Sequence, residues 1–582
     1  MKKNVKDYKP NANPNQNKNV NLKSKGSNSM KKNRRITAIL TAACLAMPLA
    51  CTAAVPFGTI AAGNNQITIS NVTGVTSVPA AYQVFTGTYE NSTLVVSGWG
   101  NGINASDFIT ALKGSTVFGT TNPFNAVTYN AESPAASAVA VAEIISDFST
   151  DKTKVQEVAK IAVRNVSATS SGSVSGNVIS GLDDGYYVIK DTATAAKHDD
   201  IYYLSDSLGM LQVAGGEALT IAPKIGLPTV KKEVQENNST KDWGKAADYN
   251  CGDAVPFKIT ITLPDNIDMY DHYYLKVVDT LGSYFNKPTA NDFSITIGGT
   301  EVSIDGNNCR FDTFLNQISI SFEDIKALKG NVTKDDTIVI EYTAVLKGNA
   351  TDLNDYGYNS NKAEITFSNN PNYNYNPNIT DTVENKPDEN NRGTSPKDIV
   401  KVYTYNLAIH KIDGVTEEEL EGVKFKIKNS KGKWAKKNTS TEDGAAPILW
   451  VDDESNAGIF ETGTGGFIED VMGIDAGEYT IKEIEALDGY NLAADTILTI
   501  SPTYADTELT KLEYQIGDKD PVANDLEEDG NTVTVEIENN KGTTLPTTGG
   551  IGTKIFYIVG GMLVVGSGAA LVIKKRVGKD EE

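Results

Sequence analysis

Two lysines of this chain occupy positions where a strand would turn them toward an apolar face. Val230 and Val234 flank Lys232 at a spacing of two residues, and Lys411 continues an alternation that begins at Leu407. Successive side chains of a strand point to opposite faces, so residues two apart share a face. Each lysine is therefore predicted to point into a protein core, where an ammonium group is costly to bury.

A carboxylate and an asparagine accompany each lysine on predicted strands of the same kind. Two parts of the chain repeat one order, with the lysine in the first strand, the acid in a middle strand and the asparagine in the last. The partners and their segments are Asp279 in 274–279, Asn361 in 361–367, Glu483 in 479–483 and Asn539 in 533–539.

These three residue types can react with one another inside a core. A buried amine and a buried acid escape the cost of charge when both become neutral, and a neutral amine is a nucleophile. A protonated Asp or Glu that hydrogen-bonds an asparagine carboxamide polarises its carbon, as an oxyanion site does. Attack by the amine then releases ammonia and leaves an isopeptide bond, and the fold supplies much of the rate by holding the reactants together.

The segment 479–490 carries Glu483, Gly489 and Tyr490 in an order that resembles the glutamate box of Cna-type immunoglobulin-like domains, although Leu487 stands where proline is usual. Such domains occur in collagen adhesins and backbone pilins and cross-link themselves by the reaction above. The cross-links that the resemblance implies are Lys411 to Asn539, assisted by Glu483, and Lys232 to Asn361, assisted by Asp279.

Two alternatives to these assignments stay open at the level of sequence. If the strand phase differs from the one assumed, Lys231, Asn369 and Asn540 are the alternative residues. Each lysine could also be a surface residue that extends its charged head into water. The repetition of the pattern in two modules favours the buried arrangement.

The C-terminal region has a motif, an apolar run and a basic cluster in that order. The run 555–573 is close to the length that spans a bilayer, and the cations behind it would stay in the cytoplasm. The order resembles the sorting signal of Gram-positive wall proteins, which a sortase cleaves between threonine and glycine; a permanent membrane anchor is the alternative. The motif residues are Leu545, Pro546, Thr547, Thr548 and Gly549.

The N-terminal region is predicted to be an export signal. Basic residues at 31–35 precede an apolar run at 36–50, and small residues follow at 52–54. A positive flank, a short apolar stretch and a small-residue exit are the parts of a secretory signal peptide.

Lys224 follows Pro223 between the first two predicted modules. The segment 219–224 resembles the pilin motif, whose lysine attacks the threonyl acyl-enzyme of the next subunit, although Ala222 replaces the usual tyrosine. This resemblance implies a polymer in which Lys224 accepts the acyl group of Thr548. An ordinary linker lysine, or Lys231 as the acceptor, are the alternatives.

Composition argues against several classes of function. The formal net charge of the 582 residues is −21, and a strongly acidic body repels nucleic acid. The chain has three His and four Cys without a CxxC pair, and no phosphate-binding glycine loop, so we expect no metal, no cofactor and no enzyme of those kinds. Cys251 and Cys309 could form one disulfide if their Cα atoms lie within about 7 Å.

The predicted fold is mostly β. Tandem immunoglobulin-like sandwiches, Cna A-like and then Cna B-like, follow a mixed β-rich module with helices at 135–148 and 155–162. The predicted parts are a leader and signal peptide (1–54), an N-terminal pilin module (55–226), an isopeptide-forming module (227–370), an Asn/Pro-rich linker or loop (371–398), a Cna B-like module (399–542) and a sorting signal with a transmembrane helix (543–582).

These resemblances imply a shaft subunit of a pilus on the wall of a Gram-positive bacterium, exported by the Sec pathway. The implied partners are sortase, neighbouring pilin subunits, peptidoglycan and a host surface protein or glycan, with transient membrane insertion of the C-terminal helix. The alternative is an adhesin anchored singly to the wall, because the same folds serve both roles.

Overall fold

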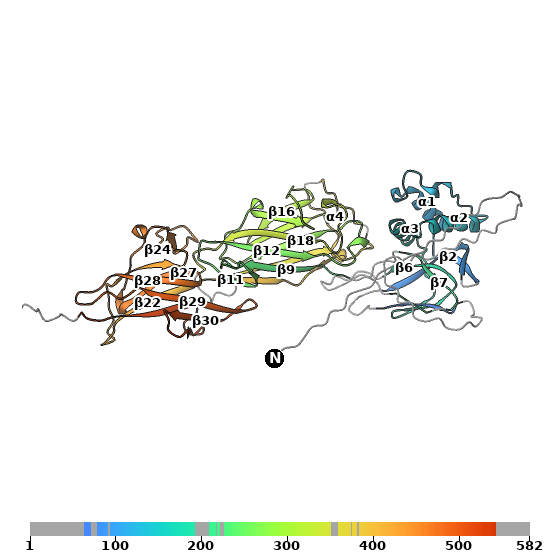
Figure 1. Ribbon diagram of the computed structural model, residues 1–582. Coiled ribbons are helices and arrows are strands. Elements are labelled where there is room, and N and C mark those ends of the chain that lie inside the picture. The colour runs from blue at the N-terminus through green and yellow to red at the C-terminus, as the bar shows by residue number, and fades with distance from the viewer. Residues whose placement is uncertain are drawn as a thin grey trace, which may run out of the picture.

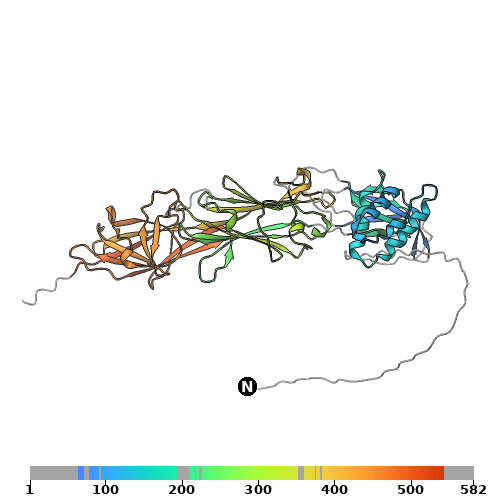
Figure 2. The same cartoon turned by 90° about the horizontal axis from the view of Figure 1, so that it is seen from above.

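The chain folds into three bodies that follow one another in chain order (Figures 1 and 2). The fold is mostly β, as the sequence predicted, and three of the four α-helices in the described ranges lie in the first body. The computed structural model describes residues 63–70, 78–90, 93–192, 209–216, 218–221, 226–350, 359–373, 375–380 and 383–542.

The first body, or first module, combines two four-stranded sheets with three helices. Both predicted helices are confirmed, as α2 (Pro134–Asp147) and α3 (Lys152–Arg164), and α1 (Ala105–Gly114) joins them. Helix α2 buries Ala138, Val141 and Ile145, which share one face because they recur at helical spacing. One sheet has the order β4 (Ser173–Ser175), β5 (Val178–Leu182), β1 (Asn65–Ile69), β8 (Ala218–Ile221). The other has the order β3 (Thr93–Trp99), β2 (Pro79–Glu90), β6 (Gly185–Asp191), β7 (Leu211–Val213).

The second module is a sandwich of two sheets. Strand β12 alternates buried and partly exposed residues along its length, as expected for a sheet with one face in the core. One sheet has the order β10 (Trp243–Gly244), β9 (Thr229–Gln235), β12 (Ala254–Thr262), β18 (Thr337–Val345), β14 (Phe293–Ile297), β15 (Thr300–Glu301). The other has the order β11 (Ala246–Asp248), β21 (Asp398–Tyr403), β19 (Ser360–Ser368), β13 (Leu275–Leu281), β17 (Gln317–Phe322), β16 (Cys309–Phe314), with β20 (Arg392–Thr394) on β19 and the short helix α4 (Ile325–Leu328) nearby.

The third module is also built of two sheets. The smaller sheet places its first strand, β22 (Tyr405–Asp413), between β27 (Phe467–Ile474) and its last strand, β32 (Thr532–Asn539). Strands β22 and β32 run parallel, with Lys411 opposite Ile537. The larger sheet has the order β25 (Ile448–Val451), β24 (Trp434–Lys437), β23 (Lys424–Asn429), β28 (Gly477–Glu485), β29 (Thr496–Ala505), β30 (Glu508–Ile516), β31 (Val522–Ala523), with β26 (Phe460–Glu461) on β23.

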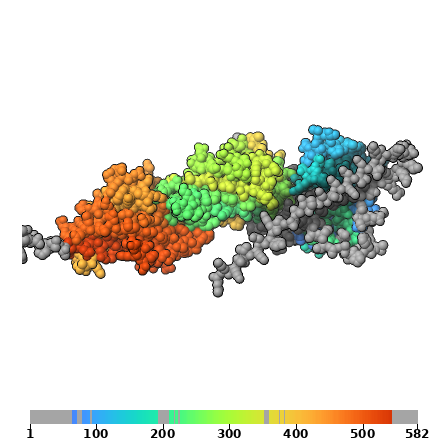
Figure 3. All heavy atoms as spheres, in the orientation of Figure 1, coloured from blue at the N-terminus to red at the C-terminus, as the bar shows by residue number. Residues whose placement is uncertain are grey.

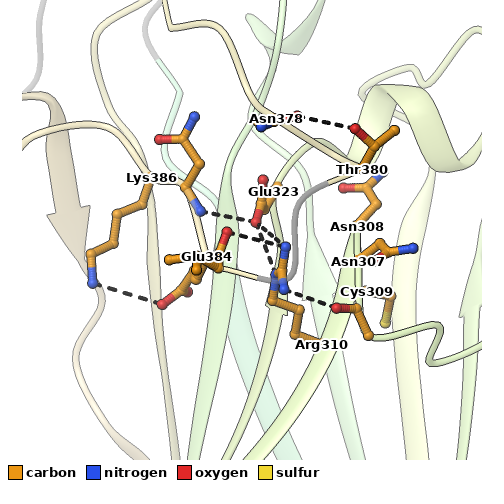
Figure 4. Close-up of polar contacts among 12 residues, drawn as sticks. Asn307, Asn308, Cys309, Arg310, Glu323, Asn378, Thr380, Glu384 and Lys386 are labelled. Atoms are coloured by element: carbon orange, nitrogen blue, oxygen red, sulfur yellow. Dashed lines mark hydrogen bonds and ion pairs between the residues drawn. The ribbon is translucent and has the colours of Figure 1, made fainter.

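The stretch 371–398, predicted as a linker or long loop, packs against the second module. It contains β20 and the first residue of β21, and both strands pair with β19. Figure 4 shows the polar contacts that hold it: Arg310 binds the fully buried Glu323 at 2.7 Å, and the backbone N–H of Asn385 donates to the same carboxylate at 2.9 Å. The sheet of the second module therefore extends through Tyr403.

The two cysteines proposed as a disulfide pair are both free and buried. The backbone N–H of Cys251 bonds to Gly473 of the third module, whereas Cys309 opens β16 beside the Arg310–Glu323 ion pair (Figure 4). The two residues thus belong to different parts of the second module, which corrects the proposed pairing. Burial raises the pKa of each thiol to about 12, which keeps it in the unreactive protonated form.

The second and third modules are in direct contact (Figure 3). A Cβ added to Gly348 of the second module would lie 1.7 Å from the carbonyl oxygen of Ala445 in the third, so this contact requires glycine. The contact is polar as well as close. Asn237 donates to the buried Asp475 at 2.7 Å, and Asp248 accepts from the backbone N–H of Ala476 at 2.8 Å.

The acidic groups at this junction bind protons unusually well. Burial, together with a hydrogen bond to Asp248 and its charge, raises the pKa of Asp475 to about 9, and burial raises the pKa of Glu236 to about 7. A raised carboxyl pKa means that the folded junction keeps a proton that the unfolded chain has lost. The resulting stabilisation is complete below the ordinary aspartate pKa of about 4 and is lost as the pH rises through the folded-state values.

We expect Asp475→Asn to flatten this pH dependence, because the amide is neutral at every pH and keeps the shape of the protonated acid. Thermal melting of the second and third modules together, measured from pH 5 to pH 9, should show a falling melting temperature for the wild type and a smaller fall for the variant. Asp518→Asn, at an exposed site, should show the same fall of melting temperature with pH as the wild type. An equal fall of melting temperature with pH in all three proteins would contradict the raised pKa of Asp475.

Candidate functional site

The three residues predicted in the second module meet in its core. Strand β13 buries Leu275, Val277 and Leu281 together with Asp279, so the carboxylate takes an apolar position. Lys232 on β9 has no exposed surface, and its Nζ lies 2.8 Å and 2.7 Å from the two carboxylate oxygens of Asp279.

Tyr342 completes this cluster from β18. Its hydroxyl accepts from Lys232 Nζ at 3.1 Å and from Asn361 Nδ2 at 2.7 Å, and it donates to Asp279. Asn361 is fully buried on β19, and its Oδ1 has no hydrogen-bond partner. A buried carbonyl oxygen without a donor is costly, and it is the atom that a protonated acid would polarise.

The electrostatics of this cluster make the amine of Lys232 easier to deprotonate. Burial lowers the pKa of Lys232, and the negative charge of Asp279 opposes that shift without cancelling it. The rings of Phe257 and Tyr342 lie 5.3 Å and 5.2 Å from Nζ and close the cluster to water. The acid and the amine are thus placed to share one proton in a dry environment.

The third module brings together its own three residues with a different arrangement. Lys411 on β22 is fully buried, and its Nζ donates to the backbone carbonyl of Ile537 at 2.8 Å. Asn539, the last residue of β32, donates from Nδ2 to Glu483 Oε1 at 2.7 Å. Here the acid contacts the amide directly, and both Glu483 Oε2 and Asn539 Oδ1 are buried without a partner.

Burial also makes the third-module amine easier to deprotonate. It lowers the pKa of Lys411 to about 8, while the charges of Glu483, Glu538 and Asp413 act in the opposite direction. About half of the amine is therefore neutral at pH 8, compared with less than about 1% for an exposed lysine.

The glutamate box holds the end of β32 beside β22. Tyr490 donates to the buried Asp413 at 2.7 Å, and the backbone N–H groups of Val415 and Thr416 bind the same carboxylate. The hydroxyl of Tyr490 and these N–H groups keep the pKa of Asp413 well below its usual range. Gly489, at φ 90°, accepts from the backbone N–H of Gly542 and so fastens the chain just beyond Asn539.

The residues that a shifted strand would have used point elsewhere. Lys231 is exposed and pairs with Glu233 on its own strand. Asn540 is exposed beside the buried Asn539. Asn369 is buried, but it lies past the end of β19, where its backbone N–H bonds to Asn391. The strand phase predicted from alternation therefore places Lys232, Asn361, Lys411 and Asn539 inward.

Tyr342 is the member of the clusters that the sequence did not reveal. It alternates with Ile338, Ile340 and Ala344 along β18, so it has the pattern of an ordinary core residue. A phenol needs a hydrogen-bond partner when buried, and that requirement is the one signal that could have singled it out.

Several predicted features lie outside the described residues. These are Lys224, the sorting motif 545–549, the signal peptide and the apolar run 555–573. Across the described ranges, no helix is long and apolar enough to cross a membrane, and no group of three or more His, Cys, Asp or Glu is arranged to hold a metal ion.

Two family matches fall on the C-terminal half of the chain. Residues 405–515 match SpaA, described as a prealbumin-like fold domain, and residues 537–580 match the LPXTG cell wall anchor motif. A relative, the Trypsin-resistant surface T6 protein of Streptococcus pyogenes serotype M6, is 25% identical over 420 residues, which cover 61% of this chain and 70% of that protein. The resemblance to sortase-assembled backbone pilins is thereby confirmed.

Solved structures of pilins also align with the chain. The T6 backbone pilin of Streptococcus pyogenes serotype M6 covers 82% of this chain and 98% of its own, with 16% identity and a TM-score of 0.45. The full-length major pilin SpaD of Corynebacterium diphtheriae covers 83% and 98%, with 16% identity and a TM-score of 0.39. The pilus 2b backbone protein of group B streptococcus covers 55% and 99%, with 24% identity and a TM-score of 0.36.

The pKa of Lys411 predicts how bond formation in the third module depends on pH. The reactive state has a neutral amine and a protonated Glu483, which together hold one proton. The rate should therefore stay level up to about pH 8 and fall about tenfold per pH unit above it, as that proton is lost. The measurement is intact mass against time for chains made by cell-free synthesis and moved into buffers from pH 6 to pH 10. A rate that stays level up to about pH 10 would show that Lys411 titrates as an exposed lysine.

Proposed function

We propose that this chain is a structural shaft subunit of a sortase-assembled pilus, stiffened by isopeptide bonds from Lys232 to Asn361 and from Lys411 to Asn539. One observation carries this proposal: two successive modules each bury a lysine, an acid and an asparagine together, upstream of a wall-anchor motif. No other pairing of buried lysines with acids is found among the described residues. Under this proposal the chain is a building unit and not an enzyme.

The net reaction is the same in both modules. The neutral lysine amine attacks Cγ of the asparagine, the protonated acid polarises the carboxamide, and the C–N bond to Nδ2 breaks. One proton passes from Nζ to Nδ2, and ammonia leaves. Asp279 serves the second module and Glu483 the third, and each acid ends the reaction as it began.

The same proposal assigns the ends of the chain. The N-terminal segment is an export signal for the Sec pathway, and residues 555–573 are a membrane helix that holds the motif 545–549 for cleavage after Thr548. The amine of Lys224 then accepts the threonyl group of the next subunit, and the last subunit is joined to peptidoglycan. Lys224 follows β8 (Ala218–Ile221) and precedes β9, at the join of the first two modules.

The two sandwiches are proposed to be immunoglobulin-like modules that carry tension. A bond between an early and a late strand lets force pass through covalent links instead of sheet hydrogen bonds. This stiffening replaces disulfides, because both cysteines of the described body are free. A host surface protein or glycan as a further partner belongs to the alternative function, an adhesin anchored singly to the wall.

Intact mass tests the internal bonds. A recombinant body of residues 55–542 should be about 34 Da lighter than its sequence, one ammonia for each bond. Asp279→Asn and Glu483→Gln keep the side-chain shapes but remove the acid, so each should restore about 17 Da, and peptide mapping should assign the loss to its module. A body with the full sequence mass would overturn both cross-links.

Polymerisation has a separate test in cells that carry a pilus sortase. Wild-type chains should form a ladder of high-mass species that survives boiling in SDS, and Lys224→Ala should collapse it to wall-bound monomer. Lys231→Ala is the matched control and should leave the ladder intact. A wild type that yields one monomeric wall-bound band would favour the adhesin, and a ladder lost only with Lys231→Ala would move the acceptor to that residue.

A further inference from the structure

The two clusters differ in how the acid reaches the departing nitrogen. In the third module, Glu483 Oε1 lies 2.7 Å from Asn539 Nδ2, so one carboxyl group can pass a proton directly to that nitrogen. In the second module, both carboxylate oxygens of Asp279 face Lys232 Nζ at 2.8 Å and 2.7 Å. The atom next to Asn361 Nδ2 is the hydroxyl oxygen of Tyr342, at 2.7 Å.

This arrangement forms an unbroken chain of hydrogen-bonding atoms across the second-module core. It runs from Lys232 Nζ to Asp279, from Asp279 to the hydroxyl of Tyr342, and from that hydroxyl to Asn361 Nδ2. Every group in the chain is buried, so bulk water has no route to carry a proton between the two nitrogens. The nitrogen Nδ2 of Asn361 must nevertheless gain one proton before it can leave as ammonia.

We propose that Tyr342 is a catalytic residue of the second module, which relays the proton from Asp279 to the departing nitrogen of Asn361. This inference rests on the proposed isopeptide bond between Lys232 and Asn361. The neutral Nζ attacks Cγ while Asp279 holds the proton that the two groups share, and the attacking nitrogen becomes acidic. The same carbon becomes tetrahedral, so Nδ2 regains a lone pair and changes from donor to acceptor.

The relay then completes the exchange. Asp279 donates its proton to the oxygen of Tyr342 as the phenolic proton passes to Nδ2, the Cγ–Nδ2 bond breaks, and ammonia departs. The carboxylate of Asp279 then takes one proton from Nζ. Tyr342 and Asp279 finish in their starting states, and the net change is the transfer of one proton from Nζ to Nδ2. Burial and the nearby charge of Asp279 raise the pKa of Tyr342 well above its ordinary value, which keeps the phenol protonated before the transfer.

Tyr342→Phe removes the relay and leaves the ring in place. Positioned proton transfer contributes about 10²- to 10⁴-fold to a rate, so we expect the second-module bond to form at least about 100-fold more slowly. The measurement is time-resolved intact mass and peptide mapping of the full body after cell-free synthesis, in which the Lys411–Asn539 bond of the same molecule should form at the wild-type rate.

Tyr273→Phe is the matched control. Tyr273 is fully buried in the same core, and its hydroxyl has no hydrogen-bond partner, so its removal should leave the rate unchanged. Wild-type loss of both ammonias together with an unaffected Tyr342→Phe would overturn the relay and leave the cross-link standing. If the second module of the wild type loses no ammonia, the cross-link from Lys232 to Asn361 is overturned, and the relay with it.

A second substitution separates proton transfer from packing. Incorporation of 3,5-difluorotyrosine at position 342 keeps the hydroxyl but makes the phenol more acidic. The relay predicts a bond-formation rate that differs from that of the wild type at the same pH, in a module that melts at the same temperature. An unchanged rate would assign to Tyr342 only the role of a packing residue and would overturn the proposal.

Discussion

The constraint on which this structure depends is the cost of placing a lysine amine in an apolar sandwich. Lys232 and Lys411 have no exposed surface, and burial lowers the pKa of both. A buried ammonium without a partner destabilises a fold by several kcal/mol, about 3–5 when a pair is broken. Each module therefore needs a group that takes up the proton, and a permanent solution is to consume the amine in an amide bond.

The two modules meet this constraint through different contacts. In the second module, the acid binds the lysine and a tyrosine binds the amide, whereas in the third the acid binds the amide and a backbone carbonyl binds the lysine. The carbonyl oxygen of the asparagine is unpartnered in both, at Asn361 and at Asn539. Polar atoms left unpaired in a core are rare, and among those of the described residues are the oxygens of both carboxamides that the proposed chemistry would consume.

Strand alternation was enough to place the residues of the proposed cross-links in the core, because a period of two fixes which side chains share a face. Alternation could not reveal Tyr342, since a core tyrosine and a catalytic one follow the same pattern. Alternation also could not reveal that 371–398 packs on the second module. Strands β20 and β21 pair with β19, but a long polar segment without alternation separates them from it in the sequence. The separation of Cys251 from Cys309 depends on tertiary structure in the same way.

The two proposed bonds would leave different lengths of chain under tension in the two modules. In the third module, force would run along β22 to Lys411, cross to Asn539 at the end of β32 and leave, so residues 412–538 carry none of it. In the second module, force would cross from Lys232 to Asn361 and then still pass through β19, the stretch 371–398 and β21. That remaining path is the part held by Arg310 and Glu323 and by Asp398, whose carboxylate accepts from Lys245 at 2.5 Å and from the backbone N–H of Lys232 at 2.6 Å. Non-covalent contacts thus hold the part of the second module that the covalent bond would not protect.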